Sequence, residues 1–325
     1  MKARTSRAFA PATIANLGSG FDVLGLALEA PGDHAVAIRQ KAPGLTFGLV
    51  CDFPGVPADP KRNVAAHVAR LFLEEMKPSF GAHLILHKVM PISSGLGSSA
   101  ASAVAAVVAM NDLLPRPLRK SELLRFALEG ERLAAGFPHA DNAAPSLFGG
   151  VSLVLAEDPL EIVPLPFLNT IFWVVVHPHC AVRTEEARRL IPKTLPLATA
   201  VRQWAHVGGL TAALATGDPK LAGRSIEDAV AEPVRAALIP GFEAVKTAAF
   251  LAGATGCTIS GSGPSLFAIA PSATSARRIG AAMAAAFRSA AGLSSDVHVS
   301  RINEVGARVE RLEMYAMPVG AGPPQ

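Results

Sequence analysis

The segment PISSGLGSSAAS, from Pro91 to Ser102, holds two glycines and five serines. Glycine adopts backbone conformations that let N–H groups approach a ligand closely. The small apolar residues from Ala103 to Leu114 predict a helix, whose N-terminus adds unpaired N–H groups and the positive end of its dipole. Together these features indicate a seat for a phosphate group, in preference to a plain Gly/Ser turn that leads into a buried helix.

Two common phosphate-binding motifs are absent from this segment. The run GLGSSA has no lysine before its serine, as a Walker A loop requires, and no third glycine, as a dinucleotide-binding loop requires. We therefore interpret the segment as a phosphate loop of another class, with its cationic partner supplied from elsewhere in the chain. One of its serine hydroxyls would reach a magnesium ion held by the phosphates.

Two further glycine-bearing turns carry residues with binding chemistry. PATIANLGSGFDVLGLAL (Pro11 to Leu28) places Asn16 and Asp22 between apolar strand-like runs, and an aspartate there can bind an ammonium group. Turn chemistry alone remains the alternative, because Asn, Gly and Asp form turns for conformational reasons. TISGSGPSLFAI (Thr258 to Ile269) would form a β-hairpin, or close a pocket against the phosphate loop with its backbone N–H groups.

Candidate metal chemistry is concentrated near the middle of the chain. Glu131, where a predicted helix ends, is a candidate ligand for Mg²⁺, which takes oxygen ligands and only one or two protein carboxylates. His139, Asp141 and Asn142 follow within a predicted loop, 136–150. No second histidine or cysteine stands at ligand spacing, so the segment gives no support to a zinc site.

The rest of the pattern predicts the elements that position these residues. The first 50 or so residues alternate short apolar runs with turn residues, as strands joined by tight turns do. Helices and strands then mix without the regular alternation of a doubly wound sheet, which favours an α+β fold with split β-α-β units. We expect strands at 83–91, 151–156, 170–178 and 257–270, and helices at 63–77, 121–133, 184–190, 199–216, 240–252 and 276–291.

Composition narrows the class of protein. The chain has 325 residues, 50% hydrophobic and 17% charged, which predicts two lobes with sizeable cores rather than disorder. A net charge of +4 without a basic run suits an anionic small ligand at least as well as a nucleic acid. Three distant cysteines, no signal-peptide pattern and no long apolar run predict a soluble, cytoplasmic protein without a membrane span.

Five segments, in the same order, carry a resemblance to one family. PISSGLGSSAAS resembles the phosphate loop of the GHMP small-molecule kinases, and PATIANLGSGFDVLGLAL resembles the N-terminal signature of the homoserine kinases among them. HADNAAPSLFGG, AEPVRAALIPGF and SGSGPSLFAI are similar to the same family. The resemblance covers most of the chain, from about Pro11 to Ile269.

The resemblance implies a two-lobed GHMP kinase fold. Residues 1–165 would form an N-terminal lobe with split β-α-β, ribosomal S5-like topology, and residues 166–325 a ferredoxin-like C-terminal α+β lobe. The proline-rich segment Asp158 to Asn169 is the expected boundary. The implied activity is phosphorylation of L-homoserine by MgATP to O-phospho-L-homoserine, in threonine biosynthesis, by an enzyme that is commonly a homodimer. Another GHMP small-molecule kinase, or a non-catalytic ligand-binding protein of this fold, are the alternatives; nucleic-acid binding has no supporting patch.

The resemblance also implies roles for individual residues in substrate binding. Asp22 would face the ammonium group of homoserine, and the two arginines suit a bidentate grip on its carboxylate. Asn142 would orient the hydroxyl, and we predict Asn142, Arg188 and Arg235 as the catalytic residues. The full set of implied substrate ligands is Asn16, Asp22, Asn142, Arg188 and Arg235.

Nucleotide and metal ligands are implied in the same way. Glu131 is preferred to Glu129 as the Mg²⁺ ligand because it lies eleven residues before Asn142, as in the family pattern, and Ser98 or Ser99 would join it. The implied ATP-binding residues are Asn63, Lys88, Pro91, Ile92, Ser93, Ser94, Gly95, Leu96, Gly97, Ser98, Ser99, Ala100 and Ala101.

The chain departs from the family pattern at a few positions. Thr13 and Ile14 stand where the signature usually has two serines, and Ser19 stands for a proline. Ser93 replaces the commoner glycine, so this residue must avoid a positive φ or accept strain. Related kinases use an aspartate at the place of Asp141 as a general base; we hypothesise that it is not an essential base here.

Overall fold

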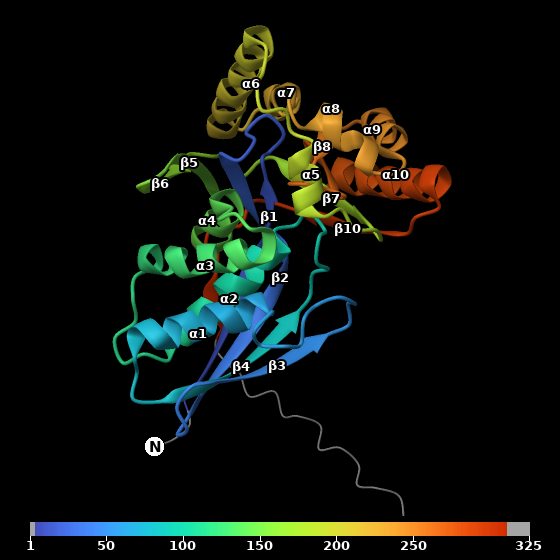
Figure 1. Ribbon diagram of the computed structural model, residues 1–325. Helices are drawn as coiled ribbons and strands as arrows, with labels where there is room; N and C mark the ends of the chain where they lie inside the picture. Colours follow the sequence, from blue (N-terminus) through green and yellow to red (C-terminus); the bar gives the residue numbers. More distant parts are fainter. Residues whose placement is uncertain (1–3, 311–325) are drawn as a thin grey trace, which may run out of the picture.

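Two β-sheets organise the chain, which the computed structural model describes over residues 4–310 (Figure 1). Within this range the first sheet has seven strands, in the order β11–β1–β2–β4–β3, with β5 paired to β2 and β6 paired to β5. β3 and β4 are parallel and α1 connects them, which is the predicted β-α-β unit. The strands are β1 (Thr5–Ala15), β2 (Leu24–Gln40), β3 (Leu45–Cys51), β4 (Gly81–Lys88), β5 (Val151–Glu157), β6 (Leu160–Leu165) and β11 (Arg308–Glu310).

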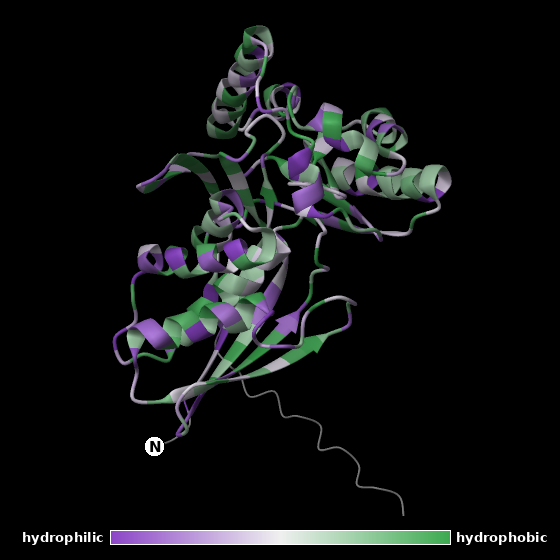
Figure 2. Cartoon of the chain, viewed as in Figure 1, coloured by the Kyte–Doolittle hydropathy of each residue, from purple (hydrophilic) through white to green (hydrophobic). Residues whose placement is uncertain are grey.

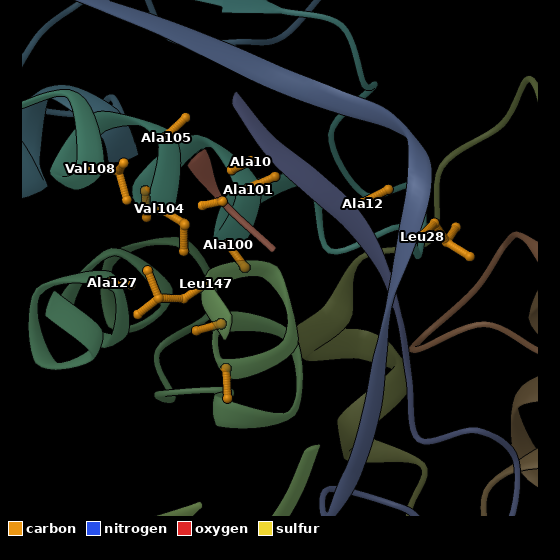
Figure 3. Packing of buried hydrophobic residues seen from close by; sticks show 14 of the residues in the cluster. Ala10, Ala12, Leu28, Ala100, Ala101, Val104, Ala105, Val108, Ala127 and Leu147 are labelled. Atoms are coloured by element: carbon orange, nitrogen blue, oxygen red, sulfur yellow. The ribbon is translucent and has the colours of Figure 1, made fainter. Parts of the chain in front are cut away.

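Four helices cover one face of this sheet: α1 (Val64–Met76), α2 (Ser98–Asp112), α3 (Lys120–Ala135) and α4 (Ala140–Phe148) (Figure 1). α2 lies at their centre and is buried on nearly every side, which explains its small, apolar composition (Figure 2). Figure 3 shows its side chains Ala100, Ala101 and Val104 in the core that also holds Ala127 of α3 and Leu147 of α4. A helix with so little space around it requires alanines, because larger side chains would separate it from the sheet.

The second sheet has four antiparallel strands in the order β10–β7–β9–β8. This is the order of a β-α-β-β-α-β unit, and the α+β, two-lobed fold expected from the sequence is confirmed. Its strands are β7 (Phe172–Pro178), β8 (Gly256–Ile259), β9 (Leu266–Ala270) and β10 (Ser295–Ser300). Around it lie α5 (Thr184–Arg189), α6 (Leu197–Thr216), α7 (Pro219–Ser225), α8 (Glu232–Arg235), the 3-10 turn η1 (Ala236–Leu238), α9 (Phe242–Leu251) and α10 (Ala273–Ala291).

Three elements differ from the sequence-based expectation, and each difference concerns the site or its borders. α2 begins at Ser98 rather than Ala103, so the serines of the glycine loop form its first turn. The prediction of a loop at 136–150 is wrong. This segment contains α4, in which Ala143, Ala144 and Leu147 are buried at helical spacing. The expected strand 257–270 is divided into β8 and β9 by the turn SGSGPS.

The border between the lobes is more complex than a single linker. The proline-rich segment includes β6, which pairs with β5 alone and is therefore an edge strand, the position in a sheet where a proline such as Pro164 is tolerated. At the other end of the described chain, β11 pairs with β1, and Leu28 forms a bridge with Ile302. The division at residues 165 and 166 therefore stays a prediction. None of the helices within residues 4–310 is long and apolar enough to cross a membrane.

Candidate active site

A cavity of about 570 Å³ lies where the phosphate loop, the ends of α3 and α4 and the β8–β9 turn meet. It brings together most of the residues that the sequence singled out. The predicted residues that line it are Asn16, Asp22, Asn63, Lys88, Ile92, Ser93, Ser94, Gly95, Gly97, Ser98, Ser99, Glu131, Asn142, Arg188 and Arg235. Of the other four, Leu96, Ala100 and Ala101 lie in the hydrophobic core, and Pro91 is half-buried beside the loop.

The phosphate loop ends at Gly97, the N-cap of α2, which has a φ of +63° and makes no side-chain capping bond. A Cβ atom here would lie 1.9 Å from Thr13 Oγ1, so only glycine fits. Ser93, which replaces the commoner glycine, has a φ of +53°. This left-handed conformation costs a residue with a side chain about 1 kcal/mol, so the loop carries strain here. The first turn of α2 thus offers its N–H groups at the cavity without a competing side-chain acceptor.

The β8–β9 turn holds the phosphate loop from the other lobe. Ser260 Oγ donates to the carbonyl of Gly95, and Ser265 Oγ donates to the carbonyl of Ser94, each at 2.6 Å. Ser265 Oγ also lies 3.1 Å from Nδ1 of the buried His177. In a trans peptide the N–H group points away from the carbonyl, so these bonds turn the next N–H groups away from the hairpin. The second glycine-rich turn is therefore a hairpin that also packs on the phosphate loop.

Lys88 supports the loop from below. Its Nζ donates to Asp33 Oδ2 (2.5 Å), to the carbonyl of Ser98 (2.7 Å) and to Ser102 Oγ (2.9 Å). Asp33 in turn accepts from the backbone N–H groups of Val89 and Met90. Both charges of the pair are nearly inaccessible to water, and their hydrogen bonds compensate for this burial. The pair ties β2, β4 and the first turn of α2 together.

Asn63, predicted near the nucleotide, is the N-cap of α1. Its side-chain oxygen accepts from the N–H groups of Ala65 and Ala66, and its Nδ2 donates to the carbonyl of Pro57. Asn63 therefore caps α1, whereas its contact with the nucleotide stays a prediction. Three cations that sequence reasoning did not single out, Lys61, Arg62 and Arg183, also line the cavity. The only signal for the first two is that they directly precede Asn63.

The two glutamates of α3 differ in their surroundings. The side chain of Glu131 is 4% exposed and lines the cavity, whereas that of Glu129 is 48% exposed and pairs with Arg132. Glu131 Oε1 is buried and finds no hydrogen-bond partner among residues 4–310, and Oε2 lies 3.6 Å from His139 Nδ1. A buried carboxylate oxygen without a donor, in a cavity that Ser98 and Ser99 also line, fits the oxygen-rich coordination of Mg²⁺. No cluster of three or more His, Cys, Asp or Glu side chains with metal-binding geometry occurs in the described part of the chain.

The predicted substrate residues form one charged cluster. Arg188 Nη2 donates to both carboxylate oxygens of Asp22, at 2.8 and 2.9 Å. Burial of Arg235 lowers the pKa of its guanidinium, and the nearby Asp22 opposes this effect. Arg235 Nη1 donates to the carbonyl of Gly261. Asn16 Nδ2 donates to that same carbonyl, and its Oδ1 accepts from the N–H of Asp22. An acid and two cations therefore share one wall of the cavity.

Asp141 and Asn142 occupy the first turn of α4. Asn142 Oδ1 accepts from Thr13 Oγ1 at 2.7 Å, and its Nδ2 lies 3.5 Å from Asp141 Oδ1. Burial raises the pKa of Asp141 to about 7, and the nearby Asp22 and Glu131 add to this effect while His139 and Arg188 oppose it. Burial alone lowers the pKa of His139, but Glu131 and Asp141 outweigh it and raise that pKa. The site thus holds acidic groups close enough to influence one another.

Comparison with known proteins identifies relatives along the whole chain. Residues 63–150 match the model of the GHMP kinases N terminal domain, and residues 210–289 match that of the GHMP kinases C terminal domain. A homoserine kinase of Chlorobaculum tepidum is 46% identical over 318 residues, which is 94% of this chain and 98% of that protein. A homoserine kinase of Halobacterium salinarum is 40% identical and covers 92% and 95% of the two chains.

Solved structures agree with these relatives. The crystal structure of a homoserine kinase from Cytophaga hutchinsonii superposes with a TM-score of 0.88 and 45% identity, covering 94% of this chain and 97% of that one. Mevalonate kinase from L. major, solved in complex with R-mevalonate, has a TM-score of 0.71 at 18% identity, over 93% and 96% of the two chains. At that identity the second likeness concerns the fold alone.

The raised pKa of Asp141 predicts a pH-dependent stability. Because the folded state binds more protons than the unfolded state between pH 3.8 and about 7, the wild-type free energy of unfolding loses this contribution as pH rises through that window. Asp141→Asn removes the titration. We expect the variant to gain stability relative to the wild type from pH 4 to 7 and to keep a constant difference above pH 8. Urea unfolding of both ligand-free proteins in EDTA measures this, and a relative gain of the wild type with rising pH contradicts it.

Proposed function

This chain belongs to the homoserine kinase family of the GHMP kinases, and we propose from the geometry of its site how it phosphorylates the hydroxyl of L-homoserine with ATP. The enzyme is a phosphotransferase in the route of amino-acid biosynthesis that leads to threonine. The alternatives of another GHMP kinase and of a non-catalytic protein are not favoured by relatives of 40–46% identity that bear this one name.

The charged cluster beside the phosphate loop is the observation that carries the site assignment. Homoserine is a zwitterion, with one positive and one negative group. In the described structure Asp22 and Arg188 form an ion pair and so neutralise each other. We assign the substrate ammonium to Asp22 and Asn16, and its carboxylate to Arg188 and Arg235. The substrate would replace one protein ion pair with two, so little charge is left uncompensated when it binds. The unpartnered Nε of Arg188 is consistent with a bidentate grip on a carboxylate.

The nucleotide would lie on the other side of the same cavity. The phosphate loop, residues 91–101, and the N-terminus of α2 would hold the triphosphate with backbone N–H groups, near Asn63 and Lys88. Glu131 with Ser98 or Ser99 would hold Mg²⁺, which supplies positive charge to the transferring phosphate when bound. Ser98 Oγ donates to the carbonyl of Met90, and this bond leaves its lone pairs free for a cation.

Transfer then depends on position more than on covalent participation by the protein. The substrate hydroxyl attacks the γ-phosphorus, a new O–P bond forms as the bond to the β–γ bridging oxygen breaks, and ADP leaves. Asn142 orients the hydroxyl, while Arg188 and Arg235 fix the far end of the substrate. The loop N–H groups stabilise charge on the transferring group. In this proposal the hydroxyl proton passes to an oxygen of that group, without an essential base.

The proposal extends to the oligomeric state, the cellular location and the lobe boundary of the enzyme. The family resemblance supports a homodimer, and size-exclusion chromatography with light scattering measures that state directly. Cys51, Cys180 and Cys257 are all free thiols, which supports a reducing, cytoplasmic location. We propose the division into lobes of residues 1–165 and 166–325. β11 is an exception, because it follows residue 166 but pairs with β1 in the first sheet.

A coupled assay of ADP release tests the substrate assignment. We expect turnover with L-homoserine and none above background with D-homoserine, mevalonate or galactose. Asp22→Asn should raise KM for L-homoserine about 30-fold or more, because the ammonium loses its anionic partner in a partly buried site, with little change in KM for ATP. Equal activity with mevalonate, or an unchanged KM for homoserine in the variant, contradicts the assignment.

The two glutamates of α3 provide a matched pair for the metal site. Glu131→Gln should lower kcat/KM by about 100-fold or more and raise the Mg²⁺ concentration needed for half-maximal rate, because the charged ligand is lost. Glu129 lies two residues away, is exposed and pairs with Arg132, so the rate of Glu129→Gln should match the wild type. Titration of Mg²⁺ in the ADP assay measures both. Equal effects of the two substitutions argue against Glu131 as a ligand.

Asp141 tests whether the reaction needs a general base. Its pKa of about 7 is suited to proton transfer, yet we predict that it is not essential. A general base contributes about 10²- to 10⁴-fold, and we expect kcat of Asp141→Asn to stay above one thousandth of the wild-type value. A loss of about 10³-fold or more, while Mg²⁺ and homoserine still bind by calorimetry, refutes the hypothesis.

A further inference from the structure

Thr13 connects the two halves of the site. It lies in β1, is fully buried, and donates a hydrogen bond from Oγ1 to Asn142 Oδ1 at 2.7 Å. Its backbone N–H donates to the carbonyl of Leu96 in the phosphate loop at 3.0 Å. One residue, far from both in sequence, therefore contacts the side chain that orients the substrate and the loop that would hold the phosphates.

The Thr13–Asn142 pair lies directly against the start of α2. A Cβ built on Gly97 would stand 1.9 Å from Thr13 Oγ1 and 2.7 Å from Asn142 Oδ1. Gly97 is the last loop residue before the N–H groups of the first turn of α2, which are the proposed phosphate ligands. The pair thus lies beside the proposed phosphate site, where the hydroxyl of homoserine would have to approach the γ-phosphate of ATP.

The hydrogen bond from Thr13 holds the Asn142 amide in place, and Asp141 determines which end of it faces the substrate, because a hydroxyl can donate to an amide oxygen or accept from an amide nitrogen. An amide has one oxygen that accepts and one nitrogen that donates. The oxygen is engaged by Thr13, and Asp141 Oδ1, 3.5 Å from Nδ2, favours the same orientation because two oxygens in that place would repel each other. The amide nitrogen is left as the group that can donate to the hydroxyl oxygen of homoserine.

We propose that Thr13 is a positioning residue for phosphoryl transfer, whose hydroxyl holds the amide of Asn142 with its nitrogen toward the substrate hydroxyl. The proposal rests on the proposed role of Asn142. It explains why Asn142 orients the hydroxyl without taking its proton, since an amide N–H₂ has no acceptor lone pair to offer. Loss of the Thr13 hydroxyl would let the amide rotate and would misplace the attacking oxygen, while the proposed ligands of the homoserine ammonium and carboxylate and of the ATP phosphates stay intact.

Thr13→Val and Thr13→Ser separate the hydroxyl from the packing. Valine keeps the shape of the side chain but removes the donor, and serine keeps the donor but removes the methyl group. We expect Thr13→Val to lower kcat about 10- to 100-fold, with KM for ATP and for homoserine within about threefold of the wild type. Thr13→Ser should retain kcat within about threefold. Equal kcat losses in both variants, or a change confined to KM, overturn the proposal.

The same substitution in an Asn142→Ala background tests whether Thr13 acts through Asn142. We expect Thr13→Val to have no further effect on kcat there, because the amide it would hold is absent. An equal loss in both backgrounds shows a packing role and overturns the proposal alone. A wild-type kcat in Asn142→Ala overturns the role of Asn142 and this proposal with it. If the valine variant does not fold, as judged by thermal unfolding, Thr13→Ala is compared with Thr13→Ser in both backgrounds.

Discussion

The hydrogen bonds between the β8–β9 turn and the phosphate loop are the contact on which the rest of the site depends. Two serine hydroxyls of one lobe engage two loop carbonyls of the other, so the loop conformation and the lobe arrangement are determined together. The same turn offers the carbonyl of Gly261 to both Asn16 and Arg235. Displacement of this turn would therefore disturb the proposed phosphate site and the proposed substrate site at once.

Burial sets the electrostatic character of the cavity. Several polar atoms at its wall, Glu131 Oε1, Ser94 Oγ and Arg188 Nε, are buried and lack partners among the described residues. An unsatisfied buried polar group costs about 1–3 kcal/mol, so three in one cavity lower the stability of the protein unless ligands engage them. The Lys88–Asp33 pair shows the contrast, because its polar atoms are engaged in hydrogen bonds that join β2, β4 and the first turn of α2.

The sequence predicted the local features of the site better than its long-range ones. The glycine loop, the helix after it and the asparagine that begins α1 follow from short-range rules, and all are found. The segment expected as a loop around Asn142 is a helix, in which Ala143 and Leu147 are buried even though Pro145 lies inside it. The pairing of Arg188 with Asp22 joins residues 166 positions apart, and no local pattern encodes such a contact.

Close approach of two backbones, rather than flexibility, explains the glycine of β2 that lies against the first turn of α4. Gly25 is a residue of β2, where glycine weakens a strand, and its φ is not positive. A Cβ there would stand 1.7 Å from the carbonyl oxygen of Asp141, so any side chain would push the first turn of α4 off the sheet. That turn holds Asn142 against Thr13 of the neighbouring strand β1. The placement of the Asn142 amide thus depends on the absence of a side chain at Gly25 as much as on the Thr13 hydroxyl that donates to it.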